Sequence, residues 1–503
     1  MMRQPVDVLV VGGGTSGAAL AGLLARDSGR TVTLLEAGPD YGAFDDGGWP
    51  AELLDASTIP GTYDWGYSGM NHPTQREPSP YNRARVIGGC SSHNGCVALL
   101  GHRRDYDHWA ELGNDGWDWE SVAPAFERAK EALRVRIPQD QELTPYQAAF
   151  VDGAVSAGIP RVEDLNDPDD VEGVAPSPAN IFNGVRWNTA IAYLDPVRRQ
   201  GNLTVVGHAL VDRVVVDGRR AVAVEAIVDG RAERFDAGRI VLAAGAYGSP
   251  AILLRSGVGP AADLAALGID VAHDLPGVGQ HLADHPVVHV NLQPTAKLLA
   301  QMEIFGTVNW LPDEQTLLKA RSSDCQEAFD LHLYAVSGQN SVVGGRQSVI
   351  EVSCIIPRSS GRLSLSSADP EAWPVIDHGY LTDPDGHDLS VLLDGLSLAR
   401  RIAANMREAG AVEGISSPDE SVTSVDDLSR WGQETVGIYY HPSCSCRMGP
   451  ASDPGAVVNP HGEVHGLEGL SICDASIFPV IMRANTNLPA AMLAEHMAGW
   501  IAG

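Results

Sequence analysis

A histidine and an asparagine near the C-terminal end of the chain are its best candidates for chemistry. His441 follows the aromatic pair Tyr439-Tyr440, and Asn485 lies 44 residues further on. The pKa of a histidine is close to working pH, so its ring can take a proton from a substrate. An asparagine can hydrogen-bond the oxygen that loses this proton. The two side chains could form an acid–base pair over a redox cofactor, and the N-terminal end indicates which cofactor.

A glycine motif near the N-terminus predicts a bound dinucleotide. Val6–Val11 is short, rich in β-branched residues and bounded by glycine, as expected of a buried parallel strand. The G-x-G-x-x-G spacing of Gly12, Gly14 and Gly17 follows at once, and Ala18–Arg26 has a helical composition. A strand–turn–helix unit of this kind places a pyrophosphate against the N-terminus of the helix.

The next predicted strand narrows the choice of dinucleotide. It covers Thr31–Leu35 and ends in Glu36. A carboxylate at this position would accept hydrogen bonds from the ribose hydroxyls and would repel a 2′-phosphate, so NADP is disfavoured. This unit alone leaves NAD and FAD open.

Further glycine-rich segments carry a family resemblance. They are Arg83–Asn94, Ala243–Pro250, Gly257–Pro260 and Gly277–Gln280. Together with the N-terminal motif and the C-terminal histidine and asparagine segments, they resemble the glucose-methanol-choline (GMC) family of flavoprotein alcohol oxidoreductases over nearly the whole chain. The resemblance implies FAD as the cofactor. It also implies an α/β fold, with a Rossmann-like FAD-binding domain and an α+β substrate domain whose antiparallel sheet is backed by helices.

The residues that contact FAD are also implied by this resemblance. They come from the N-terminal unit, the Gly88-Gly89 segment, the segments around Val211 and Gly245, and the C-terminal end. The expected cofactor-binding residues are Gly12, Gly14, Thr15, Ser16, Gly17, Glu36, Ala37, Arg85, Gly88, Gly89, Ser91, His93, Asn94, Gly95, Val211, Ala244, Gly245, Asp474, Ala475, Asn485 and Thr486.

The resemblance assigns the catalytic roles as well. His441 is the expected base, and Asn485 is the partner that hydrogen-bonds the substrate oxygen. Many family members have a second histidine in place of Asn485, whereas choline oxidases have asparagine, which points to the choline oxidase/dehydrogenase branch. His93 is similar in place to the choline-oxidase histidine that is covalently joined to the flavin 8α-methyl group. An uncoupled histidine near the dimethylbenzene ring is the alternative.

Four residues are expected to contact the substrate. Tyr440 precedes the base, and a strand through Asp330–Tyr334 would place His332 and Tyr334 on one face. Glu303 loosely resembles the glutamate that contacts the trimethylammonium group in choline oxidases. A glutamate on the surface is the alternative for Glu303.

Three departures from the family pattern concern the substrate. Cys444 and Ser445 replace the usual glycine and threonine after the histidine, and Tyr439 is bulky where choline oxidases tend to have valine. Tyr334 stands where choline oxidases have a further histidine. These departures weaken choline as the substrate more than they weaken alcohol oxidation.

The expected FAD-binding domain is assembled from residues 1–160, 196–290 and 435–503, and the substrate domain from 161–195 and 291–434. Sequence patterns support part of this division. They predict short strands and one long helix, at Asn202–Val206, Arg213–Val216, Ala221–Val228, Arg239–Leu242 and, for the helix, Val391–Met406.

Composition sets outer limits on the function. The net charge of −29 argues against nucleic-acid binding. Seven scattered cysteines indicate a reducing compartment. The apolar run Val8–Val11 is too short for a signal peptide or a membrane span, so a cytoplasmic protein is expected. No metal site is expected, because Cys444 and Cys446 fit no common metal spacing and the acidic loop Asp164–Glu172 fits no EF-hand.

The predicted reaction is alcohol oxidation. His441 removes the hydroxyl proton while a hydride passes from the alcohol carbon to flavin N5, giving an aldehyde or ketone. The substrate stays open among an amino or quaternary-ammonium alcohol, a polyol and a sugar. The acceptor is oxygen or another molecule, as in mycofactocin-associated dehydrogenases, and a homo-oligomer is compatible with the sequence. The rivals are a hydroxynitrile lyase with structural FAD and a flavin-containing sensor without turnover.

Overall fold

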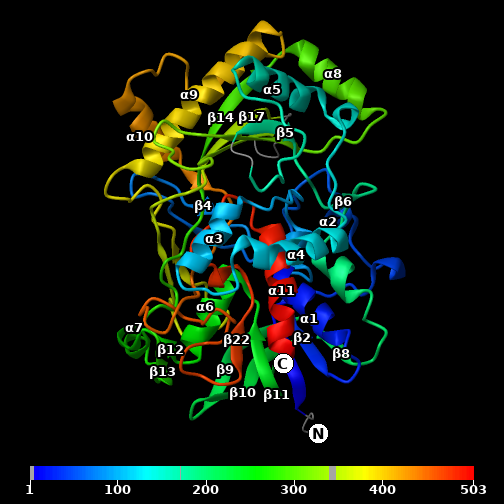
Figure 1. Cartoon of the computed structure of the whole chain (residues 1–503), viewed down its shortest axis with the longest axis vertical. Coiled ribbons are helices and arrows are strands. Elements are labelled where there is room, and N and C mark those ends of the chain that lie inside the picture. Colours follow the sequence, from blue (N-terminus) through cyan, green and yellow to red (C-terminus); the bar gives the residue numbers. More distant parts are fainter. Residues whose placement is uncertain (1–4, 170–171, 339–346) are drawn as a thin grey trace.

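A computed structural model describes residues 5–169, 172–338 and 347–503 of the chain. Two seven-stranded sheets organise these residues. Figure 1 shows the first sheet in the lower half of the molecule, beside the C-terminus, and the second sheet in the upper half. This arrangement agrees with the predicted combination of a Rossmann-like part and an antiparallel part.

The first sheet contains the predicted dinucleotide unit. Strand β1 lies in its centre and pairs in parallel with β2 and with β11. Val11 is in register with both Leu35 and Leu242, so the carboxyl ends of the three strands meet at one edge. The strand order is β8-β2-β1-β11-β10-β9, and β22 pairs with β11. The strands are β1 (Val6–Val11), β2 (Val32–Leu35), β8 (Leu203–Val206), β9 (Ala209–Asp217), β10 (Arg220–Val228), β11 (Arg231–Leu242) and β22 (Leu470–Ile472).

In this half, helices α1 and α6 pack directly on the first sheet. Helix α1 packs against α11, which in turn packs against α4. Both α1 and α11 bury many alanines, among them Ala18, Ala21, Ala491 and Ala494, and these small side chains let the helix axes come close. The helices are α1 (Thr15–Ala25), α2 (Ala51–Leu54), α3 (Arg103–Glu111), α4 (Trp119–Ala132), α6 (Gly245–Arg255), α7 (Ala261–Ala266) and α11 (Asn487–Ala502).

The second sheet is antiparallel throughout. Its order is β20-β14-β17-β16-β15-β5, and β21 pairs with β14. Side chains alternate along β16: Leu331 and Leu333 enter the apolar core of this half, and His332 and Tyr334 point to the opposite face. The strands are β5 (Gly173–Pro176), β14 (Pro286–Pro294), β15 (Glu314–Ala320), β16 (Leu331–Val336), β17 (Val349–Cys354), β20 (Val412–Ser417) and β21 (Gly437–Ile438).

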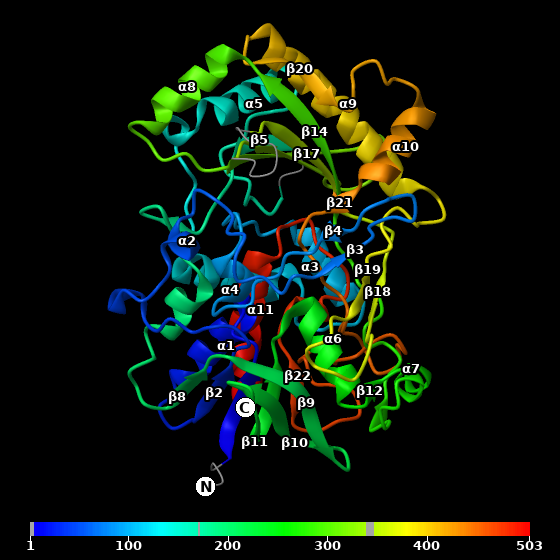
Figure 2. The ribbon, with the colours of Figure 1, turned by 180° about the vertical axis from the view of Figure 1, so that it is seen from behind.

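Four helices cover the outer face of the second sheet, as Figures 1 and 2 show. They are α5 (Pro145–Ser156), α8 (Ala296–Gly306), α9 (His387–Glu408) and α10 (Val425–Thr435). The predicted helix Val391–Met406 is confirmed within α9. The inner face of the sheet, which carries His332 and Tyr334, is therefore turned toward the dinucleotide unit.

The structure differs from the predicted division of the chain at α5. The prediction placed residues 1–160 with the FAD-binding domain, but α5 packs against α9 and β15. Its buried Tyr146 and Phe150 belong to the core of the second sheet. Strand β14 likewise begins at Pro286, before the predicted limit at residue 290. The other predicted limits stay a prediction.

Short strands and helical turns complete the described part of the chain. They are β3 (Ser68–Gly69), β4 (Ser79–Pro80), β6 (Ile181–Phe182), β7 (Val185–Arg186), β12 (Val258–Gly259), β13 (His273–Asp274), β18 (Arg362–Ser364), β19 (Val375–Asp377) and the helical turns Phe44–Asp46, Gly89–Ser92, Asp140–Glu142, Ala190–Leu194 and Ala475–Ile477. None of the helices in the described ranges has both the length and the apolar composition needed to cross a membrane.

Candidate active site

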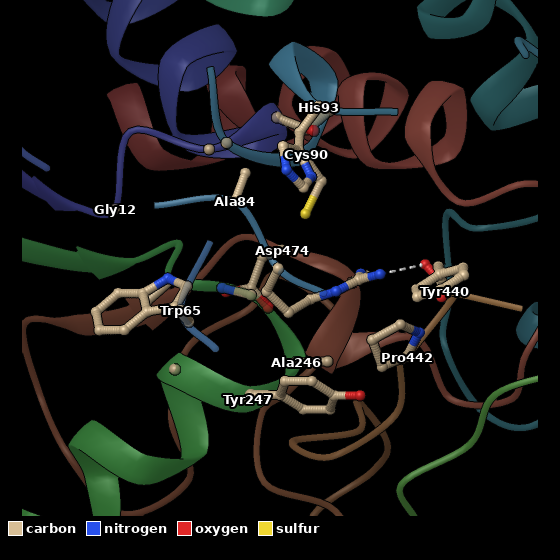
Figure 3. A pocket seen from close by; sticks show the side chains of 18 of the residues that line it. Gly12, Trp65, Ala84, Cys90, His93, Ala246, Tyr247, Tyr440, Pro442 and Asp474 are labelled. Carbon is tan, nitrogen blue, oxygen red and sulfur yellow. Dashed lines mark hydrogen bonds between the residues drawn. The ribbon is translucent and has the colours of Figure 1, made fainter. Parts of the chain in front are cut away.

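A cavity of about 480 Å³ lies between the carboxyl edge of the first sheet and the inner face of the second. Figure 3 shows it from close by, with His93 and Cys90 on one side and Tyr247 across from them. Most of the predicted site residues line it. They are Gly12, Gly14, Thr15, Ser16, Glu36, Ala37, Gly89, His93, Asn94, Gly95, Val211, Ala244, Gly245, Tyr334, Tyr440, His441, Asp474, Ala475, Asn485 and Thr486.

Four predicted cofactor residues, Gly17, Gly88, Ser91 and Arg85, do not line the cavity but contact the segments that do. A Cβ atom on Gly17 would lie 1.9 Å from the carbonyl oxygen of Gly12, so only glycine lets α1 approach β1 this closely. The Ser91 hydroxyl donates to the carbonyl of Gly88 (2.6 Å). The Arg85 guanidinium stacks over the ring of Trp65, 4.6 Å from its centroid.

The N-termini of two helices meet at one end of the cavity. Helix α1 begins at Thr15 and α11 begins at Asn487, and the Thr15 hydroxyl donates to the Asn487 amide oxygen (3.3 Å). Each helix N-terminus carries roughly half a positive charge and free N–H donors. A Cβ on Gly14 would meet no atom closer than 3.9 Å, so the backbone here borders open space. This end of the cavity fits the pyrophosphate of FAD.

Glu36 holds the glycine turn in place. Its carboxylate accepts hydrogen bonds from the backbone N–H of Gly13 and from that of Gly38, both at 2.8 Å. Burial raises the pKa of Glu36, and these two N–H groups oppose the shift. The same carboxylate lines the cavity, so it is placed to meet a ribose, and its predicted contact with the ribose hydroxyls stays a prediction.

His93 is 5% exposed in the cavity wall. Its Nε2 lies 3.0 Å from the carbonyl oxygen of Thr62. A carbonyl can only accept, so Nε2 carries the ring hydrogen and Nδ1 is left with a free lone pair. Burial lowers the pKa of His93, which keeps the ring neutral and nucleophilic.

Two consecutive residues, Asp284 and His285, hold His441 in place. Its backbone N–H donates to Asp284 Oδ1 (2.9 Å), and its Nδ1 lies 3.0 Å from His285 Nδ1. His285 Nε2 lies 3.1 Å from the carbonyl oxygen of Met482, so this nitrogen carries the hydrogen of His285. His285 Nδ1 is then the acceptor, and His441 Nδ1–H donates to it. The Nε2 atom of His441 is therefore left unprotonated, as a general base requires.

Burial sets the charge state of this group. It lowers the pKa of His285 to about 3 and that of His441 well below its ordinary value, and the nearby His285 and Arg83 lower the latter further. Burial also raises the pKa of Asp284 to about 7, against hydrogen bonds from His441 and Tyr380. The side-chain atoms of Asp284, His285 and His441 that could bind a metal ion lie within 4.8 Å of one another. The hydrogen bonds just described account for this closeness.

Asn485 is oriented by the second sheet. The Tyr334 hydroxyl donates to its amide oxygen at 2.8 Å, which leaves the amide hydrogens as donors for a substrate oxygen. The ring of Tyr439 lies 5.8 Å from that of Tyr334 and 4.8 Å from that of His441. The base, the oxygen-binding amide and two aromatic rings thus surround one part of the cavity.

Two predicted substrate residues lie outside the cavity lining. Glu303 is on the exposed side of α8, which matches the alternative of a surface glutamate. The short match to choline oxidases therefore fell on a helix that faces away from the site. His332 shares a face with Tyr334, as predicted, but it is fully buried and stacked on Phe329 at 5.7 Å.

Sequence reasoning missed two acidic residues of the cavity, Glu314 and Glu351. Glu351 forms an ion pair with His289 (3.3 Å), whereas the Glu314 carboxylate has no hydrogen-bond or ion-pair partner among the described residues. Neither residue lies in a sequence motif. Each is a single residue on one face of a strand, Glu314 in β15 and Glu351 in β17. Asp284 and His285 were also missed, although they closely follow the Gly277–Gln280 segment.

A family model described as GMC oxidoreductase matches residues 6–287 in its N-terminal part and 357–494 in its C-terminal part. The oxygen-dependent choline dehydrogenase of Pseudomonas putida is 34% identical over 100% of this chain and 95% of its own length. The enzyme of the same name from Photobacterium profundum is 31% identical over 100% and 94%.

Solved structures share the fold. Pyridoxine 4-oxidase from Mesorbium loti superposes with a TM-score of 0.86 at 26% identity and covers 98% of this chain and 99% of its own. A formate oxidase variant from Aspergillus oryzae, studied for FAD modification, gives 0.85 at 21%, covering 100% and 98%. These relatives give no support to a hydroxynitrile lyase. The chain belongs to the GMC oxidoreductase family and is an FAD-dependent oxidoreductase that acts on CH–OH groups.

Proposed function

We propose that the enzyme oxidises a small alcohol that carries a positive charge, an amino or quaternary-ammonium alcohol, with His441 as the base. The observation that supports this proposal is the pair Glu314 and Glu351 in the wall that also carries Tyr334. Relatives named choline dehydrogenase point to the same class of substrate.

The electrostatics of Glu314 favour a cationic ligand. Burial, and after it the charges of Glu351 and Asp313, raise its pKa to about 8 against the opposing charge of Arg186. A bound cation would supply the missing positive partner and favour the ionised carboxylate. The neighbouring rings of Tyr334 and Tyr439 add faces on which an ammonium group can rest.

Two side chains of the protein, His441 and Asn485, act on the hydroxyl group of the substrate. The hydroxyl proton passes to His441 Nε2, which is free because Nδ1–H donates to His285. An amide hydrogen of Asn485 binds the substrate oxygen, in an orientation that Tyr334 fixes. FAD, when bound, accepts the hydride from the alcohol carbon.

Three further points belong to the proposal. His93 forms the covalent link to FAD, which its neutral ring and free Nδ1 support. Oxygen is the electron acceptor, as the names of the relatives suggest. The enzyme works in the cytoplasm, for which the seven free cysteines are the support.

The test compares choline with its neutral isostere 3,3-dimethyl-1-butanol in anaerobic flavin bleaching, followed by admission of air. Glu314→Gln should lower kcat/KM for choline about tenfold or more, since 1.4 kcal/mol of lost attraction is a factor of ten. The neutral alcohol should be unaffected. Glu303→Gln is the matched control, because that glutamate lies on exposed α8. Equal kcat/KM values for the two alcohols in the wild type would refute the cationic substrate.

A further inference from the structure

One arginine in the wall of the active-site cavity has no acidic partner. Arg83 lines the cavity and is half-buried. Its Nη2 donates to the carbonyl oxygen of Tyr440 (3.0 Å), the bond drawn as a dashed line in Figure 3, and its Nε donates to the carbonyl oxygen of Asn82. Among the residues that the structure describes, no carboxylate forms an ion pair with Arg83. Its charge and most of its N–H donors are therefore left for a ligand in the cavity.

A second arginine of the cavity lining, Arg255, has a different environment. It stands at the C-terminal end of α6, and its Nε lies 3.3 Å from Asp212 Oδ1. The same nitrogen donates to the backbone carbonyl of Asp212 at 2.9 Å. The protein itself thus compensates the charge of Arg255. It does not do so for Arg83, although a guanidinium taken out of water needs a compensating partner.

The acid that acts on Arg83 is Asp284, and its oxygens are bonded elsewhere. Oδ1 accepts from the backbone N–H of His441 and Oδ2 from the hydroxyl of Tyr380, both at 2.9 Å. Burial lowers the pKa of Arg83, but the acidic groups around it, Asp284 among them, raise it above its ordinary value. Arg83 therefore stays protonated without a direct ion pair.

Arg83 lies close to the base and acts on both histidines of the cavity. Tyr440, whose carbonyl oxygen it binds, directly precedes His441. Burial is the main cause that lowers the pKa values of His441 and His93, and the charge of Arg83 lowers both further. His441 acts where the hydride leaves the alcohol, and His93 is the residue predicted beside the dimethylbenzene ring. A flavin that reaches from one histidine to the other is within the field of Arg83.

Alcohol oxidation brings a negative charge into this cavity. A hydride carries two electrons and one proton from the alcohol carbon to FAD, the hydroxyl proton passes to His441, and an aldehyde or ketone is left. The flavin thus gains one negative charge. We propose that Arg83 is the permanent positive charge that stabilises the flavin in its reduced, anionic form. A guanidinium keeps its proton throughout, whereas His441 is charged only after it has taken the hydroxyl proton.

This role depends on the FAD-dependent reaction alone, and not on the charge of the alcohol or on a bond to His93. It differs from a structural role at Tyr440. That residue has a φ of 64°, in the left-handed region that bulky side chains disfavour, and Arg83 holds its carbonyl group. A role confined to Tyr440 would change how fast an alcohol reduces the flavin, but it would not change the equilibrium between oxidised and reduced flavin.

The first test measures that equilibrium in the holoenzyme without any alcohol. The enzyme is reduced together with a reference dye of known potential, above pH 6.5, where His441 is neutral. Arg83→Gln removes the charge and keeps an N–H donor for Tyr440. It should lower the equilibrium constant for flavin reduction about tenfold, which is ~30 mV for a two-electron couple. Arg83→Met should act in the same way, and Arg83→Lys should stay close to the wild type. Arg255→Gln removes one positive charge from the same cavity lining and should have no effect.

The second test uses sulfite, which adds to flavin N5 through its lone pair and leaves a negative charge on the ring. Its Kd, measured from the bleaching of the flavin absorbance, should rise about tenfold in Arg83→Gln and Arg83→Met, a loss of 1.4 kcal/mol. It should be unchanged in Arg255→Gln. Wild-type values of the equilibrium constant or of the sulfite Kd in the uncharged Arg83 variants would overturn the proposal. Equal losses in Arg83→Lys or in Arg255→Gln would also overturn it. A failure of choline as substrate would leave both measurements intact.

Discussion

The Nδ1 atoms of His285 and His441 lie 3.0 Å apart, and the hydrogen between them belongs to His441. This follows from the carbonyl oxygen of Met482, which accepts from the other nitrogen of His285 (3.1 Å). The backbone carbonyl of Met482 thereby fixes which ring nitrogen of His441 is free.

Replacing the base should stop proton removal without emptying the site. His441→Ala is expected to slow anaerobic flavin reduction by about 10²–10⁴-fold, the usual contribution of a general base. The FAD content should stay normal, because the residues at the helix N-termini are untouched. Stopped-flow absorbance of the flavin measures the rate. An unchanged rate in a variant with full FAD content would remove His441 from its role.

His285 is a positioning residue for the base. His285→Leu removes the acceptor for His441 Nδ1–H and should lower kcat with little change in KM, because the free nitrogen is no longer specified. His285→Asn keeps an acceptor atom at the place of Nδ1 and should recover much of the rate. If the leucine and asparagine variants had the same kcat, the decrease would come from disturbed packing and not from the lost control of the His441 tautomer.

The acid limb of the pH profile should lie below pH 6.5. Burial, His285 and Arg83 lower the pKa of His441, so the ring stays neutral and active down to a pH at which an exposed histidine would be protonated. Activity should fall only as pH drops through that lowered pKa. A plot of kcat/KM against pH for the neutral alcohol isolates this limb, and a limb at or above 6.5 would contradict it.

Glu314 should add a second pH dependence for a cationic alcohol alone. Its pKa is raised to about 8, so the ionised form that attracts a cation grows as pH rises through this value. The apparent affinity for choline should therefore increase between about pH 7 and 9, and Glu314→Gln should abolish the increase. The same change with 3,3-dimethyl-1-butanol would show that another group is titrating.

The local order of the chain was largely predictable. The strand at Val6–Val11, the glycine turn and helix α1 follow from short-range pattern and turn chemistry, and all three are confirmed. The acid Glu36 was placed correctly at the end of β2, although the structure adds that its carboxylate also holds the turn. These features depend on residues that are close together in sequence.

The missed features depend on long-range pairing. Glu314 and Glu351 reach one cavity because β15 and β17 flank β16, and the register that sets Tyr334 opposite Glu351 is not encoded in any one segment. Glu303 was selected from a short match, which says nothing about the face of the helix it occupies. For α5, the apolar side chains of Tyr146 and Phe150 predict burial but not the sheet on which the helix is buried.

Gly17 should be essential for the cofactor unit. Gly17→Ala would place a Cβ 1.9 Å from the backbone carbonyl of Gly12, which cannot move without distorting the turn. The expected result is loss of bound FAD and a lower melting temperature. Gly499→Ala is the matched control, since no atom lies within 4 Å of its Cβ, and alanine in a helix stabilises by up to about 1 kcal/mol. Equal behaviour of the two variants would contradict the close approach of α1 to β1.

The link between His93 and FAD gives the last prediction. After denaturation in acid the flavin should stay with the protein pellet, and a proteolytic peptide containing His93 should carry the mass of FAD. His93→Ala should bind FAD but release it on denaturation. Cys90 lies on the same side of the cavity and is the other nearby nucleophile, so Cys90→Ser is the control that should keep the link. A wild-type enzyme that releases all its flavin would leave His93 as an uncoupled histidine held by Thr62. Release from Cys90→Ser but not from His93→Ala would assign the bond to the thiol.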